Sequence, residues 1–185
     1  KYDLVGANFE TFDGTDNGNR TIEQPESNMG CRLFARVADP ISHPTWFGKR
    51  EMFIDLGGYR DIYACEDFDF LVRALLKGYK VGNVNKILLH YRVRKDGISK
   101  KNYMRQTLIT NVIIDGYRKG SVISLEDIES CCTVDKLEWS QERYNKMTIA
   151  KDGIKHPKSP LQFIRAGIIT ACYWEAWHGL SPIVV

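Results

Sequence analysis

The segment from Glu66 to Gly78 constrains the fold most strongly, because its apolar residues recur with a helical period. Phe68, Leu71, Val72, Leu75 and Leu76 follow the i, i+3, i+4, i+7, i+8 rule. One face of this predicted helix should therefore be buried, with Asp69, Arg73 and Lys77 on the other face. Gly78 is a typical residue to end it.

Strand patterns lie on both sides of this helix. An apolar run within residues 2–12 predicts a first strand. After the helix, residues 80–84 and 87–93 have strand character, and they could pair as a hairpin or run on as one bent strand. A short helix is expected over residues 49–56, and residues 41–47 are expected to be extended because His43 precedes a proline.

From Ser99 onward the hydrophobic period is helical. One helix is predicted from about Ser99 to Tyr117, and a second begins at the capping-box-like Ser124. A third is predicted over residues 136–150. The segment 161–178 is apolar nearly all round but contains charged residues, so no bilayer span is expected there. The sequence thus predicts an α/β unit over residues 1–99 and a helical region over residues 100–185.

Charge, cysteines and local motifs give no indication of nucleic-acid binding, disulfides, a metal site or secretion. The net charge of +3, without a basic block, gives no indication of nucleic-acid binding. The five cysteines are odd in number and lack a C-x-x-C pair, which favours reduced thiols in the cytoplasm over disulfides or a zinc site. The turn at 13–19 lacks the ligand spacing of a calcium loop, so no metal is expected. No secretory leader is expected either, and the first residue, Lys1, suggests a piece of a longer protein.

Two adjacent carboxylates, Glu66 and Asp67, open the predicted helix. The unpaired N–H groups and aligned peptide dipoles of a first helical turn favour negative charge, which should keep Asp67 ionised and able to accept a proton. Asp67 is therefore a candidate general base. From the local pattern alone, a cap that merely suits the helix dipole is the alternative.

Several short motifs occur together in the order and spacing of a known family. They are His43-Pro-Thr45, Gly57-Gly-Tyr59-Arg60, Glu66-Asp-Phe-Asp69 and Tyr91-Arg92 through Ser99. This set resembles the second half of the family 2 glycosyltransferases of the A-type fold, over about residues 2–99. The resemblance implies a partial Rossmann-like domain with a mixed sheet and flanking helices. It also implies inverting transfer of a sugar from a nucleotide diphosphate donor to a glycan hydroxyl, in bacterial cell-surface polysaccharide synthesis.

The resemblance also implies roles for individual residues. Asp67 falls on the catalytic base, and Glu66 would orient the acceptor or tune Asp67 by like-charge proximity. The residues implied to contact substrate are His43, Asp69, Arg73, Arg92, Arg94 and Ser99. Arg92 would stabilise the charge that gathers on the leaving diphosphate.

Two features depart from the family pattern. The chain has no Asp-x-Asp after an apolar strand, the motif that holds Mn²⁺ or Mg²⁺ on the donor phosphates. The cation and the donor-binding half are therefore expected in the complete parent, before Lys1, and the isolated chain is expected to be inactive. In addition, Tyr91-Arg-Val-Arg94 replaces Tyr-Arg-x-His, and arginine can bind phosphate but cannot ligate a cation.

The expected partners are a nucleotide-sugar donor and a glycan or lipid-linked acceptor. The expected location is the cytoplasm, including the inner face of the membrane, where the apolar segment 161–178 would allow peripheral contact. Two other functions stay open. One is a non-catalytic carbohydrate-binding or scaffold domain derived from such an enzyme, and the other is an interaction module that forms a homodimer through its C-terminal helix.

Overall fold

Strand β1 (Leu4–Phe12) forms the centre of a four-stranded mixed sheet. The computed structural model describes residues 1–14, 19–94, 97 and 101–155. Strand β4 (Val81–Arg92) pairs with β1 in parallel along its whole length. Strands β2 (Arg20–Ile22) and β3 (Phe47–Gly48) pair with β1 antiparallel at opposite ends, so they share its other edge. The predicted α/β class with a mixed sheet is confirmed.

Strand β4 is one bent strand, which settles the alternative that the sequence left open. Its register against β1 shifts after Ala7, which pairs with Val84, while the next residue of β1 pairs with Ile87. The residues skipped on β4 form a bulge, and Asn85 accepts a hydrogen bond of 3.0 Å from the side chain of Asn8 there. Such bulges bend the bulged strand.

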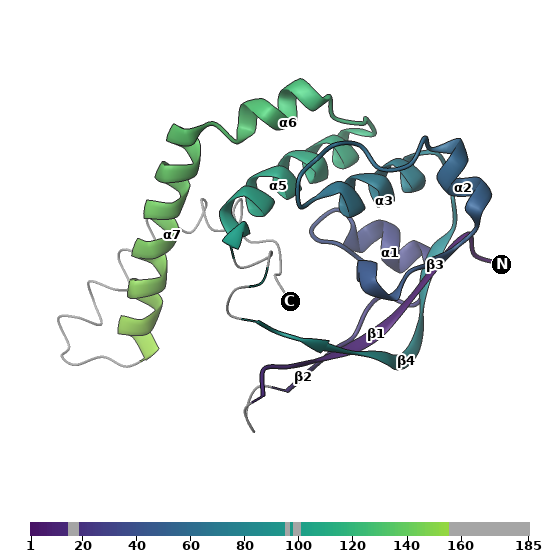
Figure 1. The fold of residues 1–185 in the computed structure, drawn as a ribbon, viewed down its shortest axis with the longest axis horizontal. Helices are drawn as coiled ribbons and strands as arrows, with labels where there is room; N and C mark the ends of the chain where they lie inside the picture. Colours follow the sequence, from purple (N-terminus) through teal and green to yellow (C-terminus); the bar gives the residue numbers. More distant parts are fainter. Residues whose placement is uncertain (15–18, 95–96, 98–100, 156–185) are drawn as a thin grey trace.

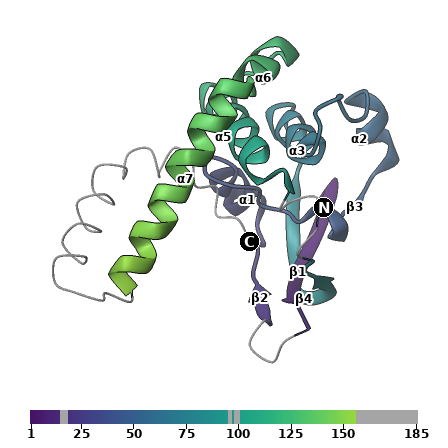
Figure 2. The ribbon, with the colours of Figure 1, turned by 60° about the vertical axis from the view of Figure 1, so that its left-hand side comes forward.

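Helices α1, α3 and α5 lie on the same side of this sheet in two views (Figures 1 and 2). The helices are α1 (Asn28–Phe34), the 3₁₀ turn η1 (His43–Thr45), α2 (Arg50–Asp55), α3 (Glu66–Leu76), α5 (Tyr103–Lys119), α6 (Leu125–Cys131) and α7 (Val134–Lys155). The predicted helices around α2, α3, α5 and α6 are confirmed, and α7 is longer than predicted. The predictions for Ser99 and for residues 161–178 lie outside the described residues. No described helix is long and apolar enough to cross a bilayer.

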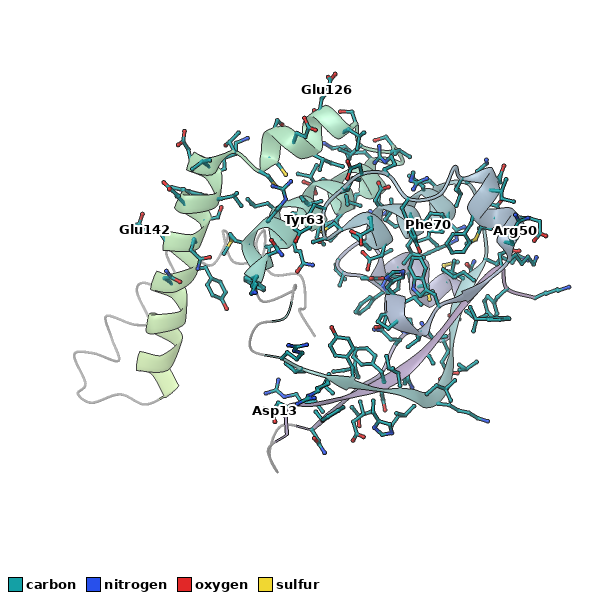
Figure 3. All side chains as sticks on the ribbon, in the orientation of Figure 1. Asp13, Arg50, Tyr63, Phe70, Glu126 and Glu142 are labelled. Carbon is teal, nitrogen blue, oxygen red and sulfur yellow. The ribbon has the colours of Figure 1, made fainter. Side chains whose placement is uncertain are left out.

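The hydrophobic core lies between α3, the sheet and α5. Its fully buried members include Leu4 and Val81 from the sheet, Leu71 from α3 and Ile109 from α5. Core residues therefore come from both sides of residue 99, so α5 packs in the same body as the predicted α/β unit. Phe70, labelled in Figure 3, is also fully buried, although it lies outside the predicted apolar stripe.

The burial of α3 differs from the sequence prediction on its polar face. Asp69 is only 2% exposed and the Arg73 side chain only 10%, so the prediction that both line an exposed face is wrong. Lys77 does lie at the surface, where it pairs with Asp55. Asp69 and Arg73 are buried because a loop closes over this part of the helix, as described below.

The segment that carries His43 packs closely against β1. A Cβ atom at Gly6 would lie 2.2 Å from Cγ2 of Ile41 and 2.4 Å from Oδ1 of Asn83, so only glycine fits this close approach. The next residue, Ala7, donates its backbone N–H to Oγ1 of Thr45 at 3.1 Å. These contacts fix the 3₁₀ turn η1 on the sheet.

Candidate active site

The start of helix α3 brings Glu66 and Asp67 together without a conventional cap. Cys65 occupies the N-cap position and makes no side-chain capping bond. Ala64, just before it, has a φ of 67°, a left-handed conformation that non-glycine residues rarely adopt and that concentrates at functional sites. Its carbonyl accepts a hydrogen bond of 2.8 Å from the Gln106 side chain, which helps to hold this conformation.

His43 lies in a turn rather than on extended chain, so that sequence prediction is wrong. The Thr45 hydroxyl donates to the carbonyl of Ser42 at 2.7 Å, and the N–H of Trp46 donates to the carbonyl of His43 at 3.0 Å. These two bonds close the turn η1, and the fixed φ of Pro44 suits a helical first turn. The turn faces the imidazole of His43 toward the start of α3.

His43 connects Asp67 with Tyr59. Nδ1 of His43 lies 3.6 Å from Oδ2 of Asp67, and Nε2 lies 3.1 Å from the Tyr59 hydroxyl. The imidazole also makes edge contacts with the rings of Trp46 and Tyr59. The three side chains come from η1, from the loop after α2 and from α3, so only the tertiary fold assembles them.

The environment of Asp67 raises the pKa of its carboxyl group. Burial is the largest cause and the charge of Glu66 adds to it, while the N–H of Phe68 and the nearby His43 oppose the rise. Loss of hydration thus outweighs the N–H group of the helix start and the nearby His43, both of which lower the pKa of Asp67. A carboxylate of raised pKa is a stronger base, which suits proton abstraction near neutral pH.

Tyr59 and Asp39 belong to the same electrostatic cluster. Burial and the charges of Asp67 and Glu66 raise the pKa of Tyr59, so its hydroxyl keeps its proton, and it lies within hydrogen-bond distance of Nε2 of His43. When the Tyr59 hydroxyl donates to Nε2, the ring N–H of His43 lies on Nδ1, the nitrogen that faces Asp67. Loss of hydration, and then the charge of Asp67, raise the pKa of Asp39 to about 8, although Ile41 donates its N–H to that carboxyl group at 3.0 Å.

Asp69 is held between two arginines, in a position that favours a structural role. Nε of Arg60 lies 3.0 Å and Nε of Arg73 2.8 Å from Oδ2 of Asp69. Arg73 also donates to the carbonyls of Leu56 and Gly58, both at 2.7 Å. Tyr59 therefore lies between two anchored loop residues, Gly58 and Arg60. Asp69 and Arg73 hold this loop, and with it Tyr59, beside His43.

Arg92 and Arg94, two further predicted substrate contacts, lie at and just after the end of β4. Arg92 is exposed at the end of β4, opposite Phe12, and Arg94 is exposed two residues later. Asp13 marks this end of the sheet in Figure 3, whereas Phe70 lies in the helix that begins at Glu66. Ser99 lies outside the described residues.

The described residues contain no group of three or more His, Cys, Asp or Glu side chains arranged to hold a metal ion.

The sequence analysis assigned no role to Tyr59, Asp39 or Arg60. Tyr59 and Arg60 do lie within a recognised motif, whereas Asp39 joins the site only through tertiary packing. In the cluster of Asp67, His43 and Tyr59, the Asp67 carboxylate can accept a proton, and the His43 imidazole can orient that carboxylate.

No family model, curated protein or solved structure matches the chain. The resemblance to glycosyltransferases therefore depends on the motifs in the sequence alone.

Replacing His43 with glutamine should move the titration of Asp67 to higher pH. Protonated His43 lowers the pKa of Asp67, and glutamine carries no charge to do so. The titration can be followed by carbon NMR of the labelled aspartate carboxyl groups. His90→Gln is the matched control, because His90 pairs with Glu10 at 3.1 Å on the sheet. An unchanged Asp67 midpoint in His43→Gln would show that the two groups are not coupled.

Proposed function

We propose that this chain is the acceptor-side part of an inverting glycosyltransferase of the family 2 type, with Asp67 as the base that activates the acceptor hydroxyl. One observation carries the proposal: a half-buried carboxylate of raised pKa lies at a helix start, 3.6 Å from an imidazole that a tyrosine orients. The motifs from His43 to Tyr91 support the same assignment.

The proposed chemistry needs one proton acceptor on this side of the reaction. The acceptor oxygen attacks the anomeric carbon of the donor sugar while its proton passes to Asp67. The bond between that carbon and the diphosphate oxygen breaks, and the nucleoside diphosphate leaves. Because the nucleophile enters opposite the leaving group, the anomeric configuration inverts. A hydroxyl is a weak nucleophile until a positioned base takes its proton, which is worth about 10²–10⁴-fold in rate.

Other residues of the cluster would act through Asp67. The charge of Glu66 raises the pKa of Asp67, as like-charge proximity requires. The imidazole of His43, oriented by Tyr59, would face the carboxylate with Nδ1–H and stabilise its ionised form. Asp69 and Arg73 would position the Tyr59 loop, which is a positioning role rather than direct contact with substrate.

On the donor side of the reaction, the described residues offer cations but no metal ligands. Exposed Arg92 and Arg94 offer cations that could pair with a diphosphate. The described residues offer no set of ligands that fits Mn²⁺ or Mg²⁺, so we assign no step to a cation. The site for the nucleotide is proposed to lie on a part of the enzyme outside these 185 residues, because they contain no Asp-x-Asp after an apolar strand.

The function can be tested with the complete polypeptide that contains residues 1–185. It would be incubated with a panel of nucleotide diphosphate sugars, with and without bacterial surface glycans, and release of nucleoside diphosphate would be measured. We expect release that depends on both a donor and a glycan. Glycan binding without any release would favour the alternative, a carbohydrate-binding domain that has lost donor chemistry.

The isolated chain should bind no nucleotide sugar in the presence of Mn²⁺ or Mg²⁺. It lacks an Asp-x-Asp motif after an apolar strand, and its described residues provide no ligand group in place of that motif. Isothermal titration calorimetry with uridine, guanosine and thymidine diphosphate sugars would measure this. Binding in the micromolar range would show that the donor site lies within these 185 residues and would overturn the proposed division of the enzyme.

A further inference from the structure

Two adjacent cysteines are in contact at the end of α6. The Sγ atoms of Cys131, the last residue of the helix, and Cys132, its C-cap, are 3.4 Å apart. Side chains of neighbouring residues often point apart, so this contact is a specific feature of the turn. Both residues are half-buried.

The other described cysteines are poorly placed to react. Cys31 and Cys65 are buried, and burial is the largest cause that raises the pKa of each thiol to about 12. Cys31 is 0% and Cys65 4% exposed, so a dissolved disulfide cannot reach either sulfur, whereas Cys131 and Cys132 are only half-buried. Cys172 lies outside the described residues, and the experiment below must therefore distinguish it.

We propose that Cys131 and Cys132 are a modification site, at which a small-molecule disulfide such as oxidised glutathione converts the two thiols into a disulfide between neighbouring residues. One thiolate attacks glutathione disulfide, forms a mixed disulfide and releases one glutathione. The second thiol loses its proton and attacks the mixed disulfide, which forms the Cys131–Cys132 bond and releases the second glutathione. The protein loses two hydrogens and the oxidant gains them. This inference is independent of the proposed glycosyltransferase function.

The resulting bond should be easy to reduce. The Cα atoms of neighbouring residues are about 3.8 Å apart across a trans peptide, below the usual range of about 4.4–6.8 Å for disulfides. Strained disulfides have more oxidising potentials and are the labile, regulatory ones. Burial, followed by the neighbouring Cys132, raises the pKa of Cys131 to about 12, so oxidation should be slow at neutral pH and faster in alkaline buffer.

Formation of the bond would alter the junction between α6 and α7. In the reduced form the Cys131 thiol donates to the carbonyl of Ile128 at 3.0 Å, and the backbone N–H of Cys132 donates to the carbonyl of Glu129 at 3.0 Å. Closing a ring between the two side chains turns the Cys131 thiol away from its acceptor. Helix α7 begins two residues later, at Val134, so its direction relative to α6 depends on this turn.

Tryptic mapping of the whole chain would test the proposal. Trypsin cuts after Lys119 and Lys136, so peptide 120–136 contains Cys131 and Cys132, while each of the other three cysteines lies on a different peptide. After treatment with excess oxidised glutathione at pH 8, we expect peptide 120–136 to lose two hydrogens in most molecules. Dithiothreitol should restore its original mass.

Substitutions make the test specific. Cys131→Ser and Cys132→Ser should each abolish the loss of two hydrogens and leave one glutathione on the remaining thiol. Cys65→Ser and Cys172→Ser should leave the result for peptide 120–136 unchanged. Peptides cross-linked to Cys65 or Cys172, or two stable glutathione adducts on peptide 120–136, would overturn the proposal.

Discussion

Replacing Asp67 with asparagine in the complete polypeptide is expected to lower kcat for sugar transfer by about 10²–10⁴-fold, the usual contribution of a general base. Asparagine keeps the size and most contacts of the side chain but cannot accept the proton of the acceptor hydroxyl. Release of nucleoside diphosphate in the presence of a glycan would be followed over a range of pH. The wild-type rate should rise with pH as Asp67 loses its proton, and the residual rate of the variant should lack this limb.

Asp61→Asn is the matched control, because Asp61 is an exposed aspartate in the loop before the same helix. It should retain wild-type activity.

A defect in Asp67→Asn would not be explained by loss of folding. A raised pKa means that the folded state disfavours the charged form of Asp67, so removal of this charge should leave the melting temperature unchanged or higher at neutral pH. Undiminished transfer by Asp67→Asn would eliminate the proposed mechanism.

Replacing Asp69 with asparagine is expected to lower the free energy of unfolding by about 3 kcal/mol, because it leaves two arginines without their buried counter-ion. The Asp69 side chain is 3% exposed, and those of Arg60 and Arg73 are 23% and 10% exposed, so water cannot compensate fully. Urea denaturation of the isolated chain, followed by circular dichroism, would measure the change.

The exposed pair of Asp115 and Arg118 provides the control, since it too joins an aspartate and an arginine of one helix. Asp115→Asn should change the free energy of unfolding by only about 0.3–0.5 kcal/mol. The same variants separate the two roles considered for Asp69. If Asp69 contacts substrate, Asp69→Asn will keep its stability and raise KM. If Asp69 holds the loop, the free energy of unfolding of Asp69→Asn will fall.

Periodic patterns made much of the fold predictable. The apolar stripe of α3 reflects burial on one face, which a sequence displays directly. The two long strands do not alternate in this way, because β1 is buried along most of its length and β4 only over its first three residues. The burial of Asp69 was not predictable in this way. Its partner Arg60 lies nine residues earlier, and only the loop that returns over α3 brings the two side chains together.

The candidate site was predictable only in part, for a similar reason. The acidic start of α3 and the motif at His43 identified two members from local sequence. The turn at His43 depends on the Thr45 hydroxyl, which competes with the extended preference of a residue before proline. Asp39 belongs to the site only because separate segments of the chain lie close together, and neither its sequence neighbours nor its spacing predicts this.

Strand β1 sets the positions of all its neighbours at once, since β4 lines one of its edges while β2 and β3 divide the other. Between those two short strands, Thr45 binds directly to Ala7. A single-residue insertion within β1 would reverse which side chains face the helices and would move the His43 turn relative to Asp67. Homologous chains should therefore vary in length before and after this strand, and hardly ever inside it.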